Sequence, residues 1–387
     1  MIEVREEIQQ MLDEVRANRR YLHQHPELEL DTVHTKAYLI EQIQSYGGFT
    51  IHEGYAENGF VATMKKSDDS LYIGFRTDMD ALAMMDLVSC DYASKWEGRA
   101  HACGHDGHMA ILLGLAHYFS RHQKEIKANI ALIFQPGEEE PGGAKCMIED
   151  GLLKDFPLSC IIGTHLMGDV EKGKIACRSG AMMARNGEVD IHLYGQSAHG
   201  AMPQLGNDAL MGAASLLLQM QTIHSRNMDP LCSAVLTFGK MEAGHVRNVI
   251  CDHVVLEGTM RAFDDSVYEM MKEKIQQMSE GVAKSFHLKA DVLIRDGYYV
   301  VNNDEQLDQL LQQVVGEDYV LQQPKMIAED FSFYQREVPG LFFYTGVKDD
   351  QHSKQIHNSR FDFDESALLY AIEIEVRLFE EMKGFYD

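Results

Sequence analysis

The chain has 387 residues and a formal net charge of −25, with 60 acidic side chains against 35 lysines and arginines. A chain of this length usually forms two domains, and its negative charge argues against nucleic acid or an anionic membrane as a partner. No apolar run reaches the length of a membrane span, and the N-terminal stretch MIEVREEIQQMLDEV lacks the apolar core of a signal peptide. The seven cysteines are scattered, so we expect no disulfide framework and a reducing cytoplasm.

The N-terminal part predicts helices followed by strands. The expected elements are helices at 3–24 and 35–46 and strands at 59–64 and 71–75. The first helix is expected to end before Pro26, because the residue before a proline avoids the helical region. Asp78 and Asp80 follow the second strand. Ligands of α/β sheets bind at the carboxyl ends of strands, so these carboxylates are site candidates, although they could equally close a turn.

Residues 101–108 read His-Ala-Cys-Gly-His-Asp-Gly-His. Thiolate and imidazole are ligands that borderline-soft divalent metals prefer, and Cys103 and His105 are close enough in sequence to reach one region of space. A histidine-rich loop that binds nothing is the alternative, because short motifs arise by chance. Further candidate metal ligands later in the chain favour the interpretation as a metal site.

Three later positions add polar groups beside predicted elements. We expect a helix at 109–121, strands at 129–134, 160–164 and 341–345, and a C-terminal helix from 363. Glu138 and Glu139 follow the strand at 129–134, His165 ends the strand at 160–164, and His357 precedes the last helix. A solvated acidic loop and a structural histidine are the alternatives at these places.

Together with Cys103 and His105, these residues exceed the needs of one tetrahedral metal site. They suit two metal ions that share a bridging group and a water. One of the adjacent glutamates, Glu138 or Glu139, would bind metal, while the other would be free to take a proton from the water. This pattern indicates a hydrolase.

The pattern changes between about residues 184 and 296. Strands are expected at 188–194, 234–238, 254–260 and 289–295, with helices at 209–225 and 266–286. We interpret this segment as a small α+β sandwich, 184–296, with one sheet and two helices. It interrupts a larger α/β domain formed by residues 1–183 and 297–387.

Several motifs in order resemble one known family. They are Leu22 to Leu28, Arg76 to Leu82, His101 to His108, Gln135 to Glu139, Gly195 to Gly200, Asn248 to Ile250, Gly258 to Arg261, Glu329 to Ser332, and His357 ahead of Asp364-Glu365. The chain resembles the aminoacylase and carboxypeptidase-like dinuclear metallopeptidases. Within them it is similar to the branch of hippurate hydrolases, auxin-conjugate hydrolases and N-acetyldiaminopimelate deacetylases. The resemblance implies a central mixed sheet flanked by helices, with the inserted domain serving as lid and dimerisation domain.

The resemblance also implies roles for individual residues. The implied metal ligands are Cys103, His105, Glu139, His165 and His357, holding two divalent ions per subunit (Zn, Mn, Ni or Co). Glu138 is implied as general base, and His199, Asn248 and Arg261 are implied to face the substrate from the lid. In dimeric relatives the histidine corresponding to His199 reaches the partner's active site, so a homodimer through the lid is expected.

Other polar residues near the motif are expected to support the ligands or to pack in the core. These are Asp78, His101, Asp106 and His108. The chain departs from residues usual in this branch at Ala83, Gly137, Cys251 and Ser359, and none of these departures removes a ligand.

The expected function is hydrolysis of the amide bond of an N-acyl amino acid, with an acetyl, benzoyl or similar acyl group and possibly with N-acetyldiaminopimelate as substrate. A dipeptidase or carboxypeptidase with the same machinery is the alternative enzyme. A metal-binding homologue without activity is a third possibility, against which the presence of both Glu138 and Glu139 argues.

Overall fold

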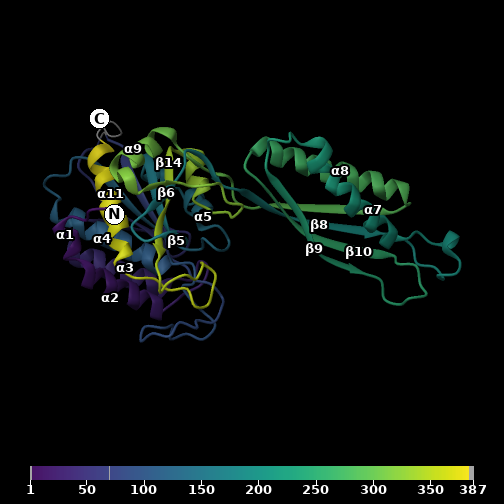
Figure 1. The fold of residues 1–387 in the computed structure, drawn as a ribbon, viewed down its shortest axis with the longest axis horizontal. Coiled ribbons are helices and arrows are strands. Elements are labelled where there is room, and N and C mark those ends of the chain that lie inside the picture. The colour runs from purple at the N-terminus through teal and green to yellow at the C-terminus, as the bar shows by residue number, and fades with distance from the viewer. Residues whose placement is uncertain (1, 69, 383–387) are drawn as a thin grey trace. The chain divides into compact units, whose positions relative to one another are not determined.

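The computed structural model describes residues 2–68 and 70–382, which divide into two compact units (Figure 1). The first unit comprises Met1–Gly180, Asn302–Gln323 and Asp330–Asp387, and the second comprises Ala181–Val301 and Pro324–Glu329. None of the helices in the described residues has the length and apolar composition needed to cross a lipid bilayer.

An eight-stranded sheet in the order β1-β2-β4-β3-β5-β14-β6-β13 forms the centre of the first unit. Its strands are β1 Thr50–Tyr55, β2 Gly59–Met64, β3 Tyr72–Asp78, β4 Asn129–Gln135, β5 Leu158–Glu171, β6 Ile175–Cys177, β13 Tyr319–Leu321 and β14 Gly340–Lys348. The central strands β4, β3, β5 and β14 run parallel, whereas β1 and β2 pair antiparallel, as do β2 with β4 and β6 with β14. The predicted α/β fold with a mixed central sheet is confirmed.

Helices cover both faces of this sheet, with α4 and α11 on one side and α5 on the other (Figure 1). The helices of this unit are α1 Glu6–Gln9, α2 Leu12–Gln24, α3 Val33–Tyr46, α4 His105–Arg121, α5 Gly143–Glu149, α6 Leu152–Asp155, α9 Glu305–Val315, α10 Ser332–Glu337 and α11 Ala367–Glu381, with a 3-10 turn η3 at Gly316–Asp318. Helix α4 is buried over most of its length. A Cβ atom at Gly107 would lie 2.4 Å from Leu166 Cδ1, so glycine at this position lets the start of α4 approach β5 closely.

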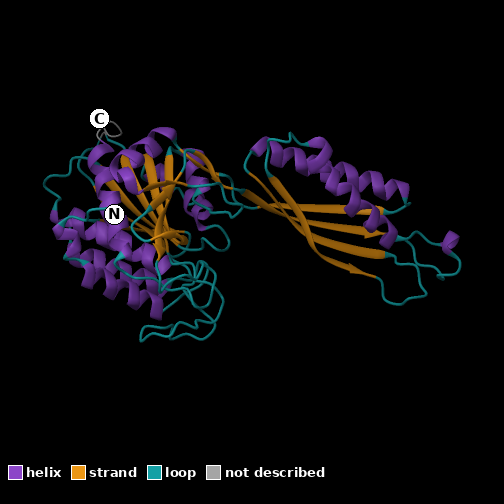
Figure 2. Cartoon of the chain, viewed as in Figure 1, coloured by secondary structure: helices purple, strands orange, loops and turns teal. Residues whose placement is uncertain are grey.

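The second unit is a four-stranded antiparallel sheet, ordered β11-β8-β10-β9, with two helices on one face (Figure 2). Its elements are β8 Arg185–Tyr194, α7 Ala209–Thr222, β9 Ala234–Ala243, β10 His253–Ala262, α8 Asp265–Ser285 and β11 Lys289–Asp296, with short turns η1 Pro203–Leu205 and η2 Ile223–Asn227. Val189, Ile191 and Leu193 alternate into the core beneath the helices. This is the small α+β architecture that the sequence predicted. A further two-stranded sheet pairs β7 Gly180–Met183 with β12 Val301–Asn303.

Several predicted elements differ in their bounds. The helix expected at 3–24 is two helices, α1 and α2, and the helix expected from 109 begins at His105. Strand β1 was not predicted, because all of its residues except the last, Tyr55, are half-buried or exposed and show no clear alternation. The strand expected to end before His165 continues to Glu171, because it pairs with β14 beyond that point. His165 therefore lies inside β5 and not at its end.

Candidate metal centre

Cys103 and His105 flank the turn that starts helix α4. Gly104 lies between them at φ 94°, a left-handed conformation that glycine adopts without strain. Both side chains are buried. His105 Nδ1 lies 2.8 Å from the backbone carbonyl of Asp80 and donates to it. Its Nε2 is buried and has no hydrogen-bond partner among the described residues. His105 therefore presents an unpaired Nε2, which is what a metal ligand requires.

His165 lies in β5 and uses its ring nitrogens as His105 does, with Nδ1 bonded to a backbone carbonyl and Nε2 near the other candidate ligands. Its Nδ1 donates to the carbonyl of Leu166 at 2.7 Å, and its Nε2 lies 3.4 Å from Cys103 Sγ. In a tetrahedral site with Zn–S of about 2.3 Å and Zn–N of about 2.0–2.1 Å, the two ligand atoms lie roughly 3.6 Å apart. The Sγ to Nε2 separation is thus close to that of two ligands of one ion. The ligand atoms of Cys103, His105 and His165 all lie within 4.8 Å of one another.

Glu139 and His357 lie on the other side of Cys103. Their Oε1 and Nε2 atoms are 3.3 Å apart, close to the roughly 3.4 Å expected of a carboxylate and an imidazole on one tetrahedral ion. The backbone N–H of His357 donates to the carbonyl of Ala102 at 2.8 Å, which fixes this segment beside Cys103. Cys103, Glu139 and His357 form a second group within 4.8 Å. Because Cys103 belongs to both groups, the five residues are arranged as two overlapping ligand sets.

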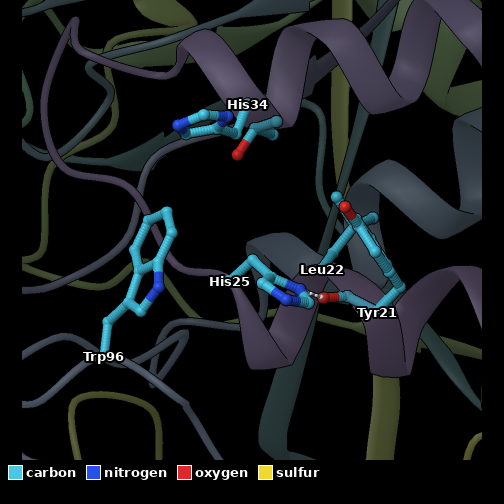
Figure 3. Close-up of a pocket in the computed structure, with 6 residues that line it drawn as sticks. Tyr21, Leu22, His25, His34 and Trp96 are labelled. Carbon is cyan, nitrogen blue, oxygen red and sulfur yellow. Dashed lines mark hydrogen bonds between the residues drawn. The ribbon is translucent and has the colours of Figure 1, made fainter.

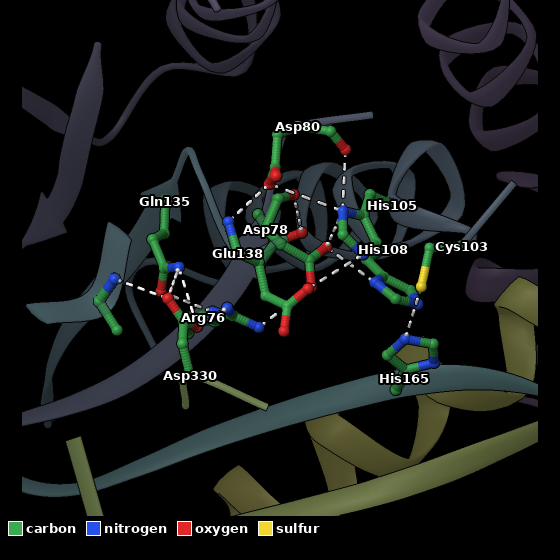
Figure 4. A network of polar contacts seen from close by, with 12 residues as sticks. Arg76, Asp78, Asp80, Cys103, His105, His108, Gln135, Glu138, His165 and Asp330 are labelled. Carbon is green, nitrogen blue, oxygen red and sulfur yellow. Dashed lines mark hydrogen bonds and ion pairs between the residues drawn. The ribbon is translucent and has the colours of Figure 1, made fainter. Parts of the chain in front are cut away.

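Asp80 holds the two adjacent glutamates in place. Its carboxylate oxygens accept hydrogen bonds from the backbone N–H groups of Glu138 at 2.9 Å and Glu139 at 3.0 Å. Its own carbonyl receives the hydrogen bond from His105 (Figure 4). Glu138 is buried, and its Oε2 lies 3.9 Å from His105 Nε2. One aspartate therefore orients both glutamates and the first histidine of the site.

Asp78 and His108 support the site through hydrogen bonds at both carboxylate oxygens of Asp78 and both ring nitrogens of His108. His108 Nδ1 donates to Asp78 Oδ1 at 2.8 Å, while its Nε2 accepts from the backbone N–H of Leu166 at 2.8 Å. Asp78 Oδ2 accepts from Arg76 Nη1 at 3.0 Å. With both ring nitrogens engaged, His108 has no lone pair for a metal. It links β3, α4 and β5 beneath the ligand atoms.

The remaining two candidates of the 101–108 motif, Asp106 and His101, are also buried. Asp106 Oδ2 accepts hydrogen bonds from Arg19 Nε at 2.7 Å and His23 Nδ1 at 2.8 Å, so this carboxylate anchors the first turn of α4 to α2. His101 is buried, and neither of its ring nitrogens has a hydrogen-bond partner in residues 2–68 and 70–382. Burial lowers the pKa of His101 to about 3, so its ring is neutral.

The charges around the ligand atoms favour a cation. Burial lowers the pKa of His105, but the charge of Asp78 and the bond to Asp80 outweigh it and raise that pKa to about 10. Burial, followed by the charges of Glu139 and Glu138, raises the pKa of the Cys103 thiol well above its usual value. Burial also holds the pKa of His165 well below its usual value, so its ring is neutral. The pKa of His105 is raised by neighbouring carboxylates, and carboxylates add to the effect of burial at Cys103. A metal ion bound here would balance this negative charge.

A second buried network was not among the predicted site residues. Asp330 Oδ1 accepts from Arg76 Nη2 at 2.7 Å, and its Oδ2 accepts from Gln135 Nε2 at 2.8 Å (Figure 4). Burial raises the pKa of Asp330 to about 6. Because Gln135 immediately precedes the glutamate loop, the network fixes the base of that loop. Asp80 was also missed as an orienting residue, although its place after β3 singled it out in the sequence.

Comparisons with known proteins agree with this geometry. The model of peptidase family M20/M25/M40 matches residues 74–381. The chain belongs to this family.

Its relatives in the family include N-acetyldiaminopimelate deacetylases. That of Lacticaseibacillus paracasei is 37% identical over 371 residues, which cover 94% of this chain and 96% of the relative. That of Listeria monocytogenes is 34% identical over 374 residues, which cover 96% of this chain and 100% of the relative. A Bacillus subtilis protein described as a dinuclear metal binding peptidase from the M20 family has a similar structure, with a TM-score of 0.84 and 27% identity, covering 96% of this chain and 98% of that one.

The lid candidates of this M20 chain, His199, Asn248 and Arg261, all lie in the second unit. His199 pairs with Val249 in an isolated bridge, and Gly200 N–H donates to the carbonyl of Asn248 at 2.8 Å, so two of the three lie side by side. His199 Nδ1 accepts from the N–H of Ala201 at 3.1 Å. Because Nδ1 accepts this hydrogen bond, a proton on the ring lies on Nε2 and not on Nδ1.

Arg261 is half-buried on β10. Its Nη1 donates to the carbonyl of Met326 at 2.7 Å, which orients the guanidinium. It forms no ion pair with a carboxylate of the described residues, and burial lowers its pKa. A guanidinium without a carboxylate partner is suited to an anionic ligand. How these lid residues relate to the metal centre remains a prediction.

Proposed function

We propose that this chain is a metal-dependent amidohydrolase that cleaves N-acyl amino acids to a carboxylic acid and a free amino acid. N-Acetyldiaminopimelate is the first substrate candidate, because the deacetylases that match this chain over most of its length carry that name. The observation that carries the proposal is the pair of overlapping ligand sets sharing Cys103, with Glu138 beside them.

The residues fit two divalent metal ions. The supporting observation is the buried Nε2 of His105, which has no hydrogen-bond partner among the described residues and lies beside a thiol, a carboxylate and a second imidazole. Cys103, His105 and His165 would hold one ion, and Cys103, Glu139 and His357 the other. Mixed sulfur, nitrogen and oxygen donors suit Zn, Mn, Ni or Co, among which affinity alone does not select. Bound metal would lower the pKa of water and polarise the amide carbonyl.

The protein's own groups would then move the proton. Glu138, fixed through its backbone by Asp80, would accept a proton from the attacking water and return it to the leaving nitrogen. Glu139 would be held by its ligand role and could not do so. This division of labour follows from position, because Asp80 orients both glutamates but only Glu139 lies against His357.

The second unit would act as a lid. His199, with its proton on Nε2, is prepared to donate a hydrogen bond to the oxyanion of the substrate. Asn248 lies beside it, and Arg261 would pair with the α-carboxylate. We further propose that the chain forms a homodimer through this unit and that His199 serves the partner's active site, since symmetric pairs are the commonest oligomers.

The test is a substrate panel with metal-reconstituted protein. N-Acetyldiaminopimelate, N-acetyl and N-benzoyl amino acids and unmodified dipeptides are compared by release of free amino acid. We expect N-acyl amino acids to give the highest kcat/KM and a chelator to abolish the release. Preference for dipeptides would establish a dipeptidase, and metal binding without any hydrolysis would establish an inactive homologue.

A further inference from the structure

Two features of the first unit lie outside the proposed ligand sets. One is a small pocket lined by Tyr21, Leu22, His25, His34, Thr35 and Trp96 (Figure 3). Its aromatic rings already have partners, since the guanidinium of Arg99 lies over Trp96 and Tyr38 stacks on Tyr21. We interpret this pocket as part of the packing around α2 and α3. The other feature is the buried carboxylate of Asp330.

The glutamate loop, residues 136–143, closes on itself. The N–H groups of Gly142 and Gly143 both donate to the carbonyl of Gly137, at 3.0 Å and 2.8 Å. A Cβ atom at Gly143 would lie 1.7 Å from the carbonyl oxygen of Pro136, so the ends of the loop approach more closely than a side chain would allow. The direction in which the loop presents its glutamates therefore depends on how these two ends are held.

Asp330 holds both ends of the glutamate loop. Before the loop, Gln135 Nε2 donates to Asp330 Oδ1 at 3.0 Å and to Oδ2 at 2.8 Å. After the loop, the backbone N–H of Ala144 donates to Oδ2 at 2.9 Å. Arg76 Nη2 donates to Oδ1 at 2.7 Å (Figure 4). One carboxylate thus ties the end of β4 to the start of α5 and joins both to β3.

Arg76 connects this carboxylate to the polar groups beneath the ligand atoms. Its Nη1 donates to Asp78 Oδ2 at 3.0 Å, and its Nε donates to Gln135 Oε1 at 2.9 Å. A carboxylate oxygen of Asp330 lies within 4.8 Å of a carboxylate oxygen of Glu138. All of these side chains are buried. Hydrogen bonds to charged groups are strong in such surroundings, so the network is suited to fix a position.

We propose that Asp330 is a positioning residue that directs Glu138 for proton transfer by holding the ends of the glutamate loop. This inference rests on the proposed function. Asp80 holds the middle of the loop through two backbone N–H groups, and bonds at the middle alone would leave the loop free to turn about them. Bonds at both ends prevent that rotation. A catalytic group that is misplaced by about 1 Å can lose roughly a hundredfold in rate.

The substitution Asp330→Asn tests this role. It keeps the size of the side chain and an oxygen for Arg76, but its NH2 group cannot accept the hydrogen bonds that Oδ2 takes from Gln135 and Ala144. We expect kcat to fall about ten- to one-hundredfold, the equivalent of one lost charge-assisted hydrogen bond. KM should stay within about twofold, because substrate binding is not involved.

The same substitution in the Glu138→Gln background separates positioning from a general structural effect. If Asp330 acts through Glu138, the double variant should have the kcat of Glu138→Gln within about twofold. Asp308→Asn is the matched control, because Asp308 is also buried and accepts from Gln312 Nε2 at 2.8 Å and from the Tyr319 hydroxyl at 2.9 Å. This control should keep kcat within about twofold of the unsubstituted protein.

Each outcome of this double-mutant cycle has one meaning. No hydrolysis by the unsubstituted, metal-reconstituted protein would refute the proposed function. With that activity present, an unchanged kcat in Asp330→Asn, an equal loss in both backgrounds, or a loss that follows metal content by elemental analysis would overturn this inference alone. If Asp330→Asn does not fold by circular dichroism, Gln135→Met removes the bonds at one end of the loop and enters the same cycle.

Discussion

The substitution Asp80→Asn tests how the glutamate pair is oriented. The asparagine keeps the size of the side chain and one acceptor oxygen, but its NH2 group must face one of the two backbone N–H groups that the carboxylate now accepts. One charge-assisted hydrogen bond is lost, which is worth about 1.5–3 kcal/mol. If that energy positions Glu138 in the transition state, kcat/KM falls about ten- to one-hundredfold. The backbone carbonyl that orients His105 is untouched, so metal content should be unchanged.

The assay is steady-state hydrolysis together with elemental analysis of the same samples. Asp304→Asn is the matched control, because Asp304 likewise accepts two backbone N–H groups, at 2.9 Å and 3.1 Å, but at the start of α9. Both N–H groups bond to the single Oδ1 atom of Asp304, which asparagine retains, and asparagine caps a helix about as well as aspartate, so this control should keep its activity within about twofold. The reasoning is refuted if Asp80→Asn stays fully active, or if its activity falls only in proportion to lost metal.

Three further predictions follow from the structure. Burial raises the pKa of Glu375 from 4.5 to about 8, so the stability that this residue contributes below pH 4.5 is lost as the pH rises through 8. Glu375→Gln should therefore stabilise the protein at pH 9 by a few kcal/mol, at roughly 1.4 kcal/mol per pKa unit. A gain in the free energy of urea unfolding that is the same at pH 5 and pH 9 would contradict this. Cys103→Ala should lose metal from both ligand sets, and full metal retention by elemental analysis would remove Cys103 from the site. If His199 serves the partner subunit, mixing inactive Glu138→Ala with inactive His199→Ala protein should restore about a quarter of all sites after random exchange, and no recovery with confirmed hybrid dimers would assign His199 to its own chain or to no catalytic role.

Sequence reasoning was most informative where chemistry is local. Cys103 and His105 are two positions apart, and Glu138 and Glu139 directly follow a buried strand, so residue type and strand order nominate them without any tertiary contact. The alternation of Val189, Ile191 and Leu193 likewise predicted a half-buried strand, which the structure contains.

The sequence could not reveal which nitrogen of each histidine is available. That choice is made by distant backbone groups, such as the carbonyl of Asp80 for His105 and the N–H of Leu166 for His108. The same limit explains His165, whose strand continues only because β14, more than 170 residues later, pairs with it.

The central claim is that two adjacent glutamates have different roles at a two-metal site. The most direct measurement is metal content and turnover of Glu138→Gln and Glu139→Gln, prepared and reconstituted in parallel. Glu138→Gln should keep both metal ions and lose about a hundred- to ten-thousandfold in turnover, the usual contribution of a general base. Glu139→Gln should lose metal. Metal loss at position 138 with retention at position 139 would contradict the account.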